Sequence, residues 1–258
     1  MFKLEVSRIK KNPIFWLVII LGFILAVIPV IDLWPHGVTK DYYVDYPMSA
    51  YISWMFFTGN TYHIYSLIFP LLATLAYSDA YAEDFNSGFI KNILTKVNKN
   101  KYLRVRFIVN FLVGGSVSTF PLIVNFLGEM TAFPLIENNQ YFGMPIVIED
   151  SFWPQLFYSH PFLYVMLRML IIFLFGGMLA SLGLAFSTII KNRYIVLIFP
   201  FLIVLIIDIL LTSLRMNSLS DIFLWNVKAS IEIPSFLIVG LAGTFIWYYV
   251  LGDKHETI

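Results

Sequence analysis

Six apolar runs, each long enough to cross a lipid bilayer, dominate the sequence and restrict the folds open to it. A spanning helix needs about 20 apolar residues, and lipid leaves every backbone polar group to be satisfied within the segment. The 258 residues are 59% hydrophobic and only 13% charged, whereas soluble domains are about 25% charged. The sequence therefore predicts an all-α polytopic membrane protein with a single transmembrane domain, 1–258. The six predicted transmembrane helices are 14–33, 52–77, 107–127, 162–188, 194–212 and 234–251.

The basic residues indicate how these spans are oriented. If the N-terminus is inside, 13 of the 17 Lys and Arg residues fall on the cytoplasmic side and four fall outside. Such a bias is typical of inner loops, so we expect both termini to be cytoplasmic. The basic N-terminal stretch precedes a run long enough to span, which argues against a cleaved signal peptide.

Two segments outside the spans are expected to lie along the membrane surface. Residues 1–13 place Phe2, Val6 and Ile9 on one helical face among basic residues, which predicts an N-terminal amphipathic interfacial helix. The alternative is that these basic residues only anchor the N-terminus on the inner side of the membrane. Residues 128–161 are too apolar and aromatic for a solvated loop, so we expect an extracellular or interfacial segment that includes a short helix or re-enters the bilayer.

The segment between spans two and three is basic and has its own apolar pattern. Phe85, Phe89, Ile93 and Val97 recur every four residues, which predicts an amphipathic helix over 83–97. Acidic residues begin this helix and lysines follow, as the helix dipole favours. Such a helix suits a groove on a cytoplasmic partner. A basic loop that only fixes topology is the alternative.

The same segment resembles type 2 ABC-transporter permeases. Asp84 precedes Gly88 by four residues, a Lys91-Asn92-Ile93-Leu94 run follows, and Lys99 comes before a basic cluster that enters the third span. In that family an acidic residue precedes a Gly-Thr-(Leu/Ile)-Lys run, and a Pro-(Val/Leu)-Ser-Arg turn comes next. This chain departs from the pattern at Phe89, which replaces the Thr, and at Asn98 and Lys99, which replace the Ser and Arg. The Pro is missing.

The resemblance implies a coupling helix that a separate cytoplasmic ATP-binding-cassette ATPase would bind. It also implies a second permease copy or homologue, membrane lipids as surroundings, and ATP and Mg in the partner ATPase. The chain itself would bind no cofactor, and no G-x-x-x-x-G-K-[ST] motif occurs in it. The bacterial plasma membrane is the expected location. The expected coupling residues are Glu83, Asp84, Phe85, Gly88, Phe89, Lys91, Asn92, Ile93 and Lys96.

Polar residues inside the spans are candidates for a substrate path. Asp208 lies within the fifth span, and Asn110 and Asn125 lie within the third. Pairing of Asp208 with Arg215 and helix-to-helix hydrogen bonds of the asparagines are the structural alternatives. The chain has no cysteine and no H-E-x-x-H motif, so we expect no catalytic or metal site. A net charge of +1 gives no reason to expect nucleic acid.

The expected function is that of a permease subunit that exports a hydrophobic or amphipathic peptide, a lipid or a drug. ATP hydrolysis in the partner would drive this export, so the chain itself would not be an enzyme. The alternative is a non-transport membrane scaffold or immunity protein that recruits a cytoplasmic partner through 83–106. An embedded enzyme is a third reading with less support in the sequence.

Overall fold

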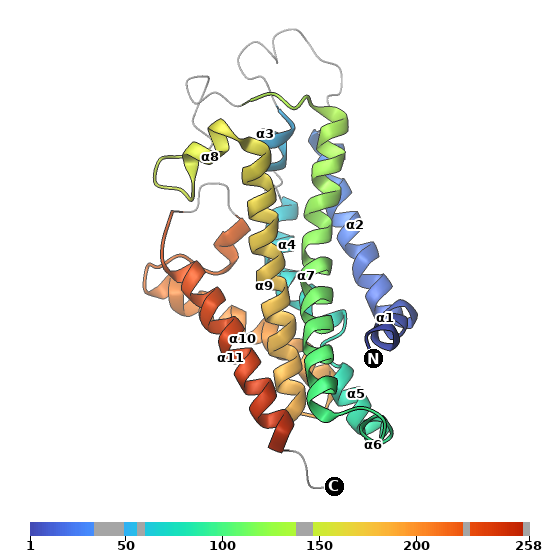
Figure 1. Ribbon diagram of the computed structural model, residues 1–258. Coiled ribbons are helices and arrows are strands. Elements are labelled where there is room, and N and C mark those ends of the chain that lie inside the picture. The colour runs from blue at the N-terminus through green and yellow to red at the C-terminus, as the bar shows by residue number, and fades with distance from the viewer. Residues whose placement is uncertain (34–48, 56–59, 138–146, 224–227, 255–258) are drawn as a thin grey trace.

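The computed structural model describes residues 1–33, 49–55, 60–137, 147–223 and 228–254. Within these ranges the chain forms helices, and an isolated bridge pairs Ser151 with Lys228. The long helices form a bundle in which the last ones, drawn in orange and red, lie obliquely to the others, and shorter helices lie at the two ends (Figure 1). As Figure 1 is oriented, the lower end holds α1 (Phe2–Lys11), α5 (Ala80–Asn86) and α6 (Phe89–Leu94), and the upper end holds α3 (Ala50–Met55) and α8 (Pro154–Ser159).

Five helices in the described part of the chain are long and apolar enough to cross a membrane. Their bounds agree closely with five of the six predicted spans, although α7 is longer at both ends than its predicted span of 107–127. The protein is therefore a multi-pass, all-helical membrane protein. The five helices are α2 (Pro13–Leu33), α7 (Lys99–Ala132), α9 (Pro161–Ile189), α10 (Arg193–Ser213) and α11 (Glu232–Lys254).

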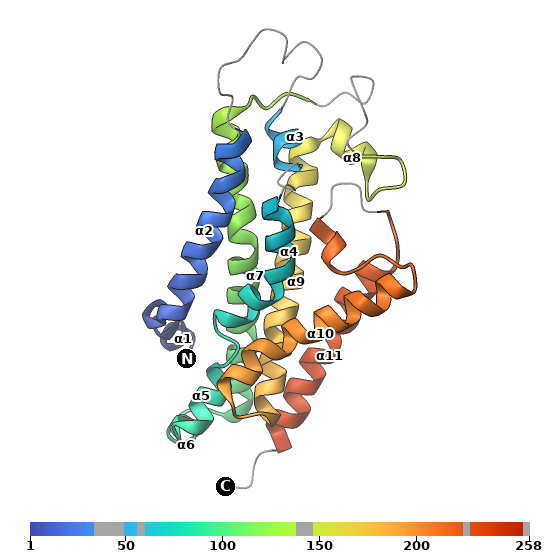
Figure 2. The same cartoon turned by 180° about the vertical axis from the view of Figure 1, so that it is seen from behind.

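The described residues of the predicted second span, 52–77, belong to two helices and the turn that follows them. The structure places α3 (Ala50–Met55) and α4 (Asn60–Leu75) there, with 56–59 outside the described residues. By itself α4 rises about 24 Å at 1.5 Å per residue, which is less than the roughly 30 Å of hydrocarbon. In Figures 1 and 2, α3 lies nearer the upper end and α4 continues toward the middle of the bundle.

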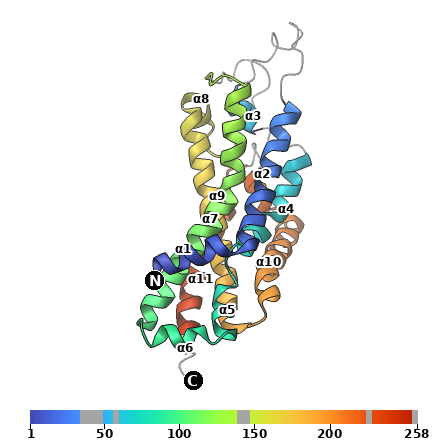
Figure 3. The same cartoon turned by 90° about the vertical axis from the view of Figure 1, so that its right-hand side faces the viewer.

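Helices form in both of the predicted surface segments, and their place at the membrane surface stays a prediction. Helix α1 (Phe2–Lys11) forms where an amphipathic helix is expected, and it crosses the lower end at a steep angle to α7 (Figure 3). In the 128–161 segment, α7 continues to Ala132 and a short helix, α8 (Pro154–Ser159), forms. Residues 138–146 lie outside the described part, so re-entry into the bilayer stays a prediction.

The expected helix over 83–97 is two short helices instead of one. Helix α5 spans Ala80–Asn86 and α6 spans Phe89–Leu94. Between them Gly88 has a φ of 70°, in the left-handed region that favours glycine. The apolar residues keep a four-residue spacing across this turn, so their periodicity alone predicts one helix. The spacing carries no information about the backbone conformation of Gly88.

Helices α7 and α9 form the centre of the bundle and approach each other through glycines. A Cβ on Gly114 of α7 would lie 3.0 Å from the Gly176 carbonyl oxygen of α9 and 3.1 Å from the Ala73 carbonyl oxygen. Small residues allow such close packing of membrane helices. In the most apolar 18-residue stretch of α9, 72% of the residues are buried, against 22% in α10 and 17% in α11. Helices α10 and α11 therefore lie at the periphery of the bundle (Figure 2).

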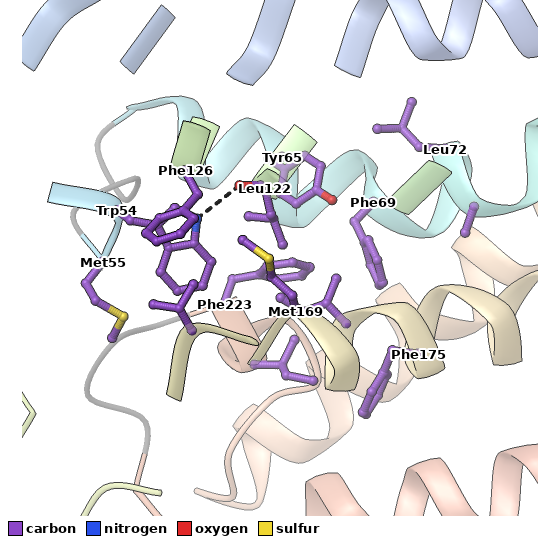
Figure 4. Packing of buried hydrophobic residues seen from close by; sticks show 14 of the residues in the cluster. Trp54, Met55, Tyr65, Phe69, Leu72, Leu122, Phe126, Met169, Phe175 and Phe223 are labelled. Carbon is purple, nitrogen blue, oxygen red and sulfur yellow. Dashed lines mark hydrogen bonds between the residues drawn. The ribbon is translucent and has the colours of Figure 1, made fainter. Parts of the chain in front are cut away.

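Aromatic rings fill the core toward the upper end. The Phe69 ring packs edge-on against Phe223, with ring centroids 4.9 Å apart, and Trp54 packs edge-on against Phe126. The indole Nε1 of Trp54 donates to the Leu122 carbonyl oxygen at 3.1 Å (Figure 4). These contacts fix α3, α4 and the short 3-10 helix η2 (Ser220–Phe223) against α7 and α9.

The glycine contact between α7 and α9 gives a direct test of the fold. We expect Gly114→Ala to lower the free energy of unfolding by about 1–3 kcal/mol, because backbone atoms on two neighbouring segments would have to move. Gly243→Ala on α11 is the matched control, since a Cβ there meets nothing within 4 Å. Thermal unfolding in detergent measures both, and equal stability of the two variants would contradict the packing.

Candidate functional site

An arginine at the lower end of α7 lies completely buried between two buried carboxylates. Arg106 donates from Nη1 to Glu5 Oε2 of α1 at 2.6 Å, and its Nη2 forms an ion pair with Asp84 Oδ2 of α5. All three side chains have no exposed surface. One guanidinium thus joins three elements that are far apart in the sequence. We call this cluster, with the side chains bonded to it below, the charge network.

Two tyrosines complete the surroundings of Arg106. The Tyr77 hydroxyl donates to Glu5 Oε2 and accepts from Arg106 Nη1 at 2.8 Å. The Tyr102 hydroxyl donates to Asp84 Oδ2 at 2.8 Å. The guanidinium carbon lies 5.6 Å and 5.4 Å from the centroids of these two rings. Hydrogen bonds and ring contacts of this kind offset the cost of taking charges out of water.

A second arginine links α1 to both short helices. Arg8 Nη1 lies 2.7 Å from Asp84 Oδ1, and Nη2 lies 3.3 Å from Glu83 Oε2. Its guanidinium carbon also lies 5.4 Å from the centroid of the Phe89 ring in α6. Glu5 and Arg8 are three residues apart, so one face of α1 supplies an acid and a base to the same cluster.

The far side of α5 is bonded to the turn between α9 and α10. Arg193 donates from Nε to Asp79 Oδ2 at 2.8 Å, and Asn86 Nδ2 donates to the Lys191 carbonyl oxygen at 2.8 Å. The Lys191 ammonium lies 4.3 Å from the Phe85 ring centroid. Burial raises the pKa of the Asp79 carboxyl above its usual value, although the bonds from Arg193 oppose this. Burial lowers the pKa of Lys191 to about 8.

The apolar stripe of the 83–97 segment faces the interior of this chain. Ile90 and Ile93 are buried, and Phe85, Phe89 and Val97 are half-buried. They pack with Tyr81, Tyr102, Leu103, Leu184 and Tyr248. These apolar residues are therefore occupied within the subunit. The exposed residues of the segment are Asn86, Ser87, Lys91, Asn92, Leu94, Thr95 and Lys96.

Apart from Gly88, the predicted coupling residues thus divide into a group that contacts this subunit and a group that is exposed. Glu83, Asp84, Phe85, Phe89 and Ile93 contact other parts of this subunit through ion pairs or apolar packing. Gly88 makes the turn between α5 and α6. Lys91 and Asn92 of α6 are exposed, and so is Lys96, which follows that helix.

The three polar residues proposed for a substrate path lie in separate places. Asn125 donates from Nδ2 to the Ala26 carbonyl oxygen of α2 at 3.1 Å and contacts Glu129, whose other carboxylate oxygen accepts from Ser53. Asn110 is completely buried, and its amide nitrogen and oxygen have no hydrogen-bond partner among the described residues. Asn125 therefore joins helices, while no contact accounts for Asn110.

Asp208 lines a cavity of about 540 Å³ between α4 and α10, together with His63, Ser66 and Thr212. Its Oδ1 accepts from the Leu219 backbone N–H at 2.6 Å. The carboxylate therefore holds the chain that follows α10 back against that helix. The expected pairing with Arg215 is not among the ion pairs of the described residues, and the Arg215 backbone has a φ of 57°.

Sequence reasoning did not identify Glu5, Arg8, Tyr77, Arg106 or Arg193 as site residues. In the sequence, Arg106 contributes only to the bias of basic residues toward the cytoplasmic side. A usable signal is present, because Arg106 directly precedes the third predicted span, 107–127. A cation so close to the hydrocarbon needs a partner, yet the sequence does not say which acid provides it.

Comparison with known proteins finds no matching family model, no matching curated protein and no matching solved structure.

The charge network can be tested by removing its central cation. Arg106→Gln leaves two buried carboxylates near one remaining arginine, so we expect a loss of about 3–5 kcal/mol of stability. Arg104→Gln is the control, because Arg104 is exposed on the same helix. Thermal unfolding in detergent provides the measurement.

A rescue variant separates loss of charge balance from a general packing defect. Adding Glu5→Gln and Asp84→Asn to Arg106→Gln removes the uncompensated charges, so the triple variant should be more stable than Arg106→Gln alone. If Arg106→Gln is as stable as Arg104→Gln, the network does not stabilise the fold.

Proposed function

We propose that this chain is the permease subunit of an ATP-binding-cassette transporter in a bacterial plasma membrane. The observation that supports it most is the pair of short helices α5 and α6, which sit beneath the bundle and are bonded to α1, α7 and the α9–α10 turn. An element bonded to so many helices would transmit a displacement at α6 to several spans at once.

The contact with the partner ATPase would use the exposed side of α6 instead of the apolar stripe. Lys91, Asn92 and Lys96 are exposed there, and Leu94 is 39% exposed beside them. A basic rim around one apolar anchor suits an acidic cleft on a cytoplasmic protein. In this proposal ATP and Mg belong to the ATPase, and the permease supplies the helix that the ATPase moves.

The remaining features of the proposal concern topology and assembly. We propose that α3 and α4 together form the sixth span, and that the lower end faces the cytoplasm. Helix α1 and the C-terminal end of α11 both lie at the lower end (Figure 1). The bias of Lys and Arg supports placing that end on the cytoplasmic side. The largely exposed apolar surfaces of α10 and α11 leave room for a second permease copy.

The cargo would be a hydrophobic or amphipathic peptide, with lipids and drugs as further candidates. The cavity between α4 and α10 supports an amphipathic cargo, because apolar side chains and several hydroxyls line it beside Asp208. Export would follow when ATP-driven closure of the ATPase changes the position of α5 and α6 and, through the charge network, of α7.

We expect Lys91→Glu combined with Lys96→Glu to weaken ATPase binding by about tenfold or more, because two like-charge contacts replace two attractive ones. Folding should be unaffected, since both side chains are exposed. Lys228→Glu, which reverses the charge of one exposed lysine near the upper end, is the control for charge reversal elsewhere on the surface. Co-purification with candidate ATPases and ATP turnover in proteoliposomes measure the effect.

The outcomes distinguish the proposal from its alternative. Binding and turnover that both fall in the double variant, but not in Lys228→Glu, support a permease. A bound partner that hydrolyses no ATP indicates a membrane scaffold or immunity protein instead. Unchanged binding and turnover in the double variant would rule out α6 as the coupling contact.

A further inference from the structure

We propose that a groove between α1, α2 and α7 binds one acyl chain of an anionic phospholipid from the leaflet at the lower end. The groove has a volume of about 490 Å³, and side chains from all three helices line it. This inference concerns a binding site in the membrane and does not depend on the proposed transport function.

The length of the groove matches one leaflet. Its wall on α7 extends from Val109 through Val113 and Ser116 to Phe120. These residues recur on one helical face over eleven positions, about 16 Å at 1.5 Å per residue. Half of a bilayer's hydrocarbon core is about 15 Å thick. An acyl chain that enters at the lower end would therefore remain in apolar contact along its length.

The end of the groove near α1 is basic. Lys10 lines the groove, and Lys3 and Lys11 are exposed on the same helix. The one acid of α1, Glu5, is buried against Arg106, so the exposed charge of α1 is positive. No ion pair involves these three lysines within the described part of the chain. This charge complements an anionic headgroup and favours it over a zwitterionic one.

An indole marks the expected depth of the headgroup. Trp16 lines the groove beside Lys10, is 50% exposed, and donates from Nε1 to the Lys10 carbonyl oxygen at 2.8 Å. Tryptophan prefers the boundary between headgroups and hydrocarbon. Lys10 and Trp16 thus place the polar end of the ligand at the membrane interface and its chain along α7.

Occupancy of the groove would also support the charge network. Val6 and Ile9 of α1 line the groove, while Glu5 and Arg8 of the same helix bond to Arg106 and Asp84. A bound chain packs against α1 from the membrane side and holds it in the position that these bonds require. Lipid composition would therefore affect the stability of the lower end.

Native mass spectrometry of the detergent-purified protein, titrated with phosphatidylglycerol or phosphatidylcholine, tests the site. We expect the wild type to retain one phosphatidylglycerol in preference to phosphatidylcholine. Ser116→Trp fills the groove and should lose that lipid, whereas Ser159→Trp on α8, an exposed serine near the upper end, should retain it. Lys10→Glu should weaken phosphatidylglycerol binding roughly tenfold, and Lys96→Glu should not.

Two results would overturn the proposal. Equal retention of phosphatidylglycerol by Ser116→Trp and Ser159→Trp would mean that only general annular lipid is bound. Equal retention of the two lipids by the wild type would exclude the anionic headgroup. If Ser116→Trp does not fold, Ser116→Leu, which adds apolar bulk in the same place, is measured against Ser159→Leu with the same expected outcomes.

Discussion

The burial of Arg106 between Glu5 and Asp84 is the constraint on which the lower end of this protein depends. A guanidinium and two carboxylates removed from water are costly unless each is paired and hydrogen-bonded. Here the two acids come from α1 and α5, and Tyr77 and Tyr102 supply further hydrogen bonds. The pairing is satisfied only when α1 crosses the bundle and α5 folds back against α7. The positions of these surface elements therefore follow from one buried cation.

Two kinds of interaction then link this end to the rest of the molecule. Ion pairs and hydrogen bonds join α5 to α1, α7 and the α9–α10 turn. Close glycine contacts join α7 to α9 in the middle of the membrane region. A displacement applied to α6 would therefore reach the central pair of helices without passing through a flexible loop. This continuous set of contacts is the physical basis for the proposed coupling role. The apolar stripe of 83–97 is part of it, because it packs α5 and α6 against the other helices of the subunit.

Local sequence patterns predicted the parts of the fold that local physics determines. Hydropathy located five spans to within a few residues at most boundaries, since the length of an apolar run is set by the bilayer. Periodicity did not separate α5 from α6, because Gly88 interrupts the helix without interrupting the apolar spacing. The pairing of Arg106 with Glu5 joins residues 101 positions apart, and no spacing rule applies over that distance. The apolar stripe of 83–97 packs inside the subunit, whereas the sequence pattern favoured its exposure to a partner.

Spin labels on α1 and α6 can show whether the charge network holds these two helices in a fixed relation. The chain has no cysteine, so single cysteines at the exposed positions Ser7 and Asn92 can be labelled without other changes, with a second pair at Ile123 and Leu163 as a control for the bundle. We expect a narrow Ser7–Asn92 distance distribution that broadens in the Arg106→Gln background while the control pair is unchanged. A Ser7–Asn92 distribution that stays equally narrow without Arg106 would contradict this expectation.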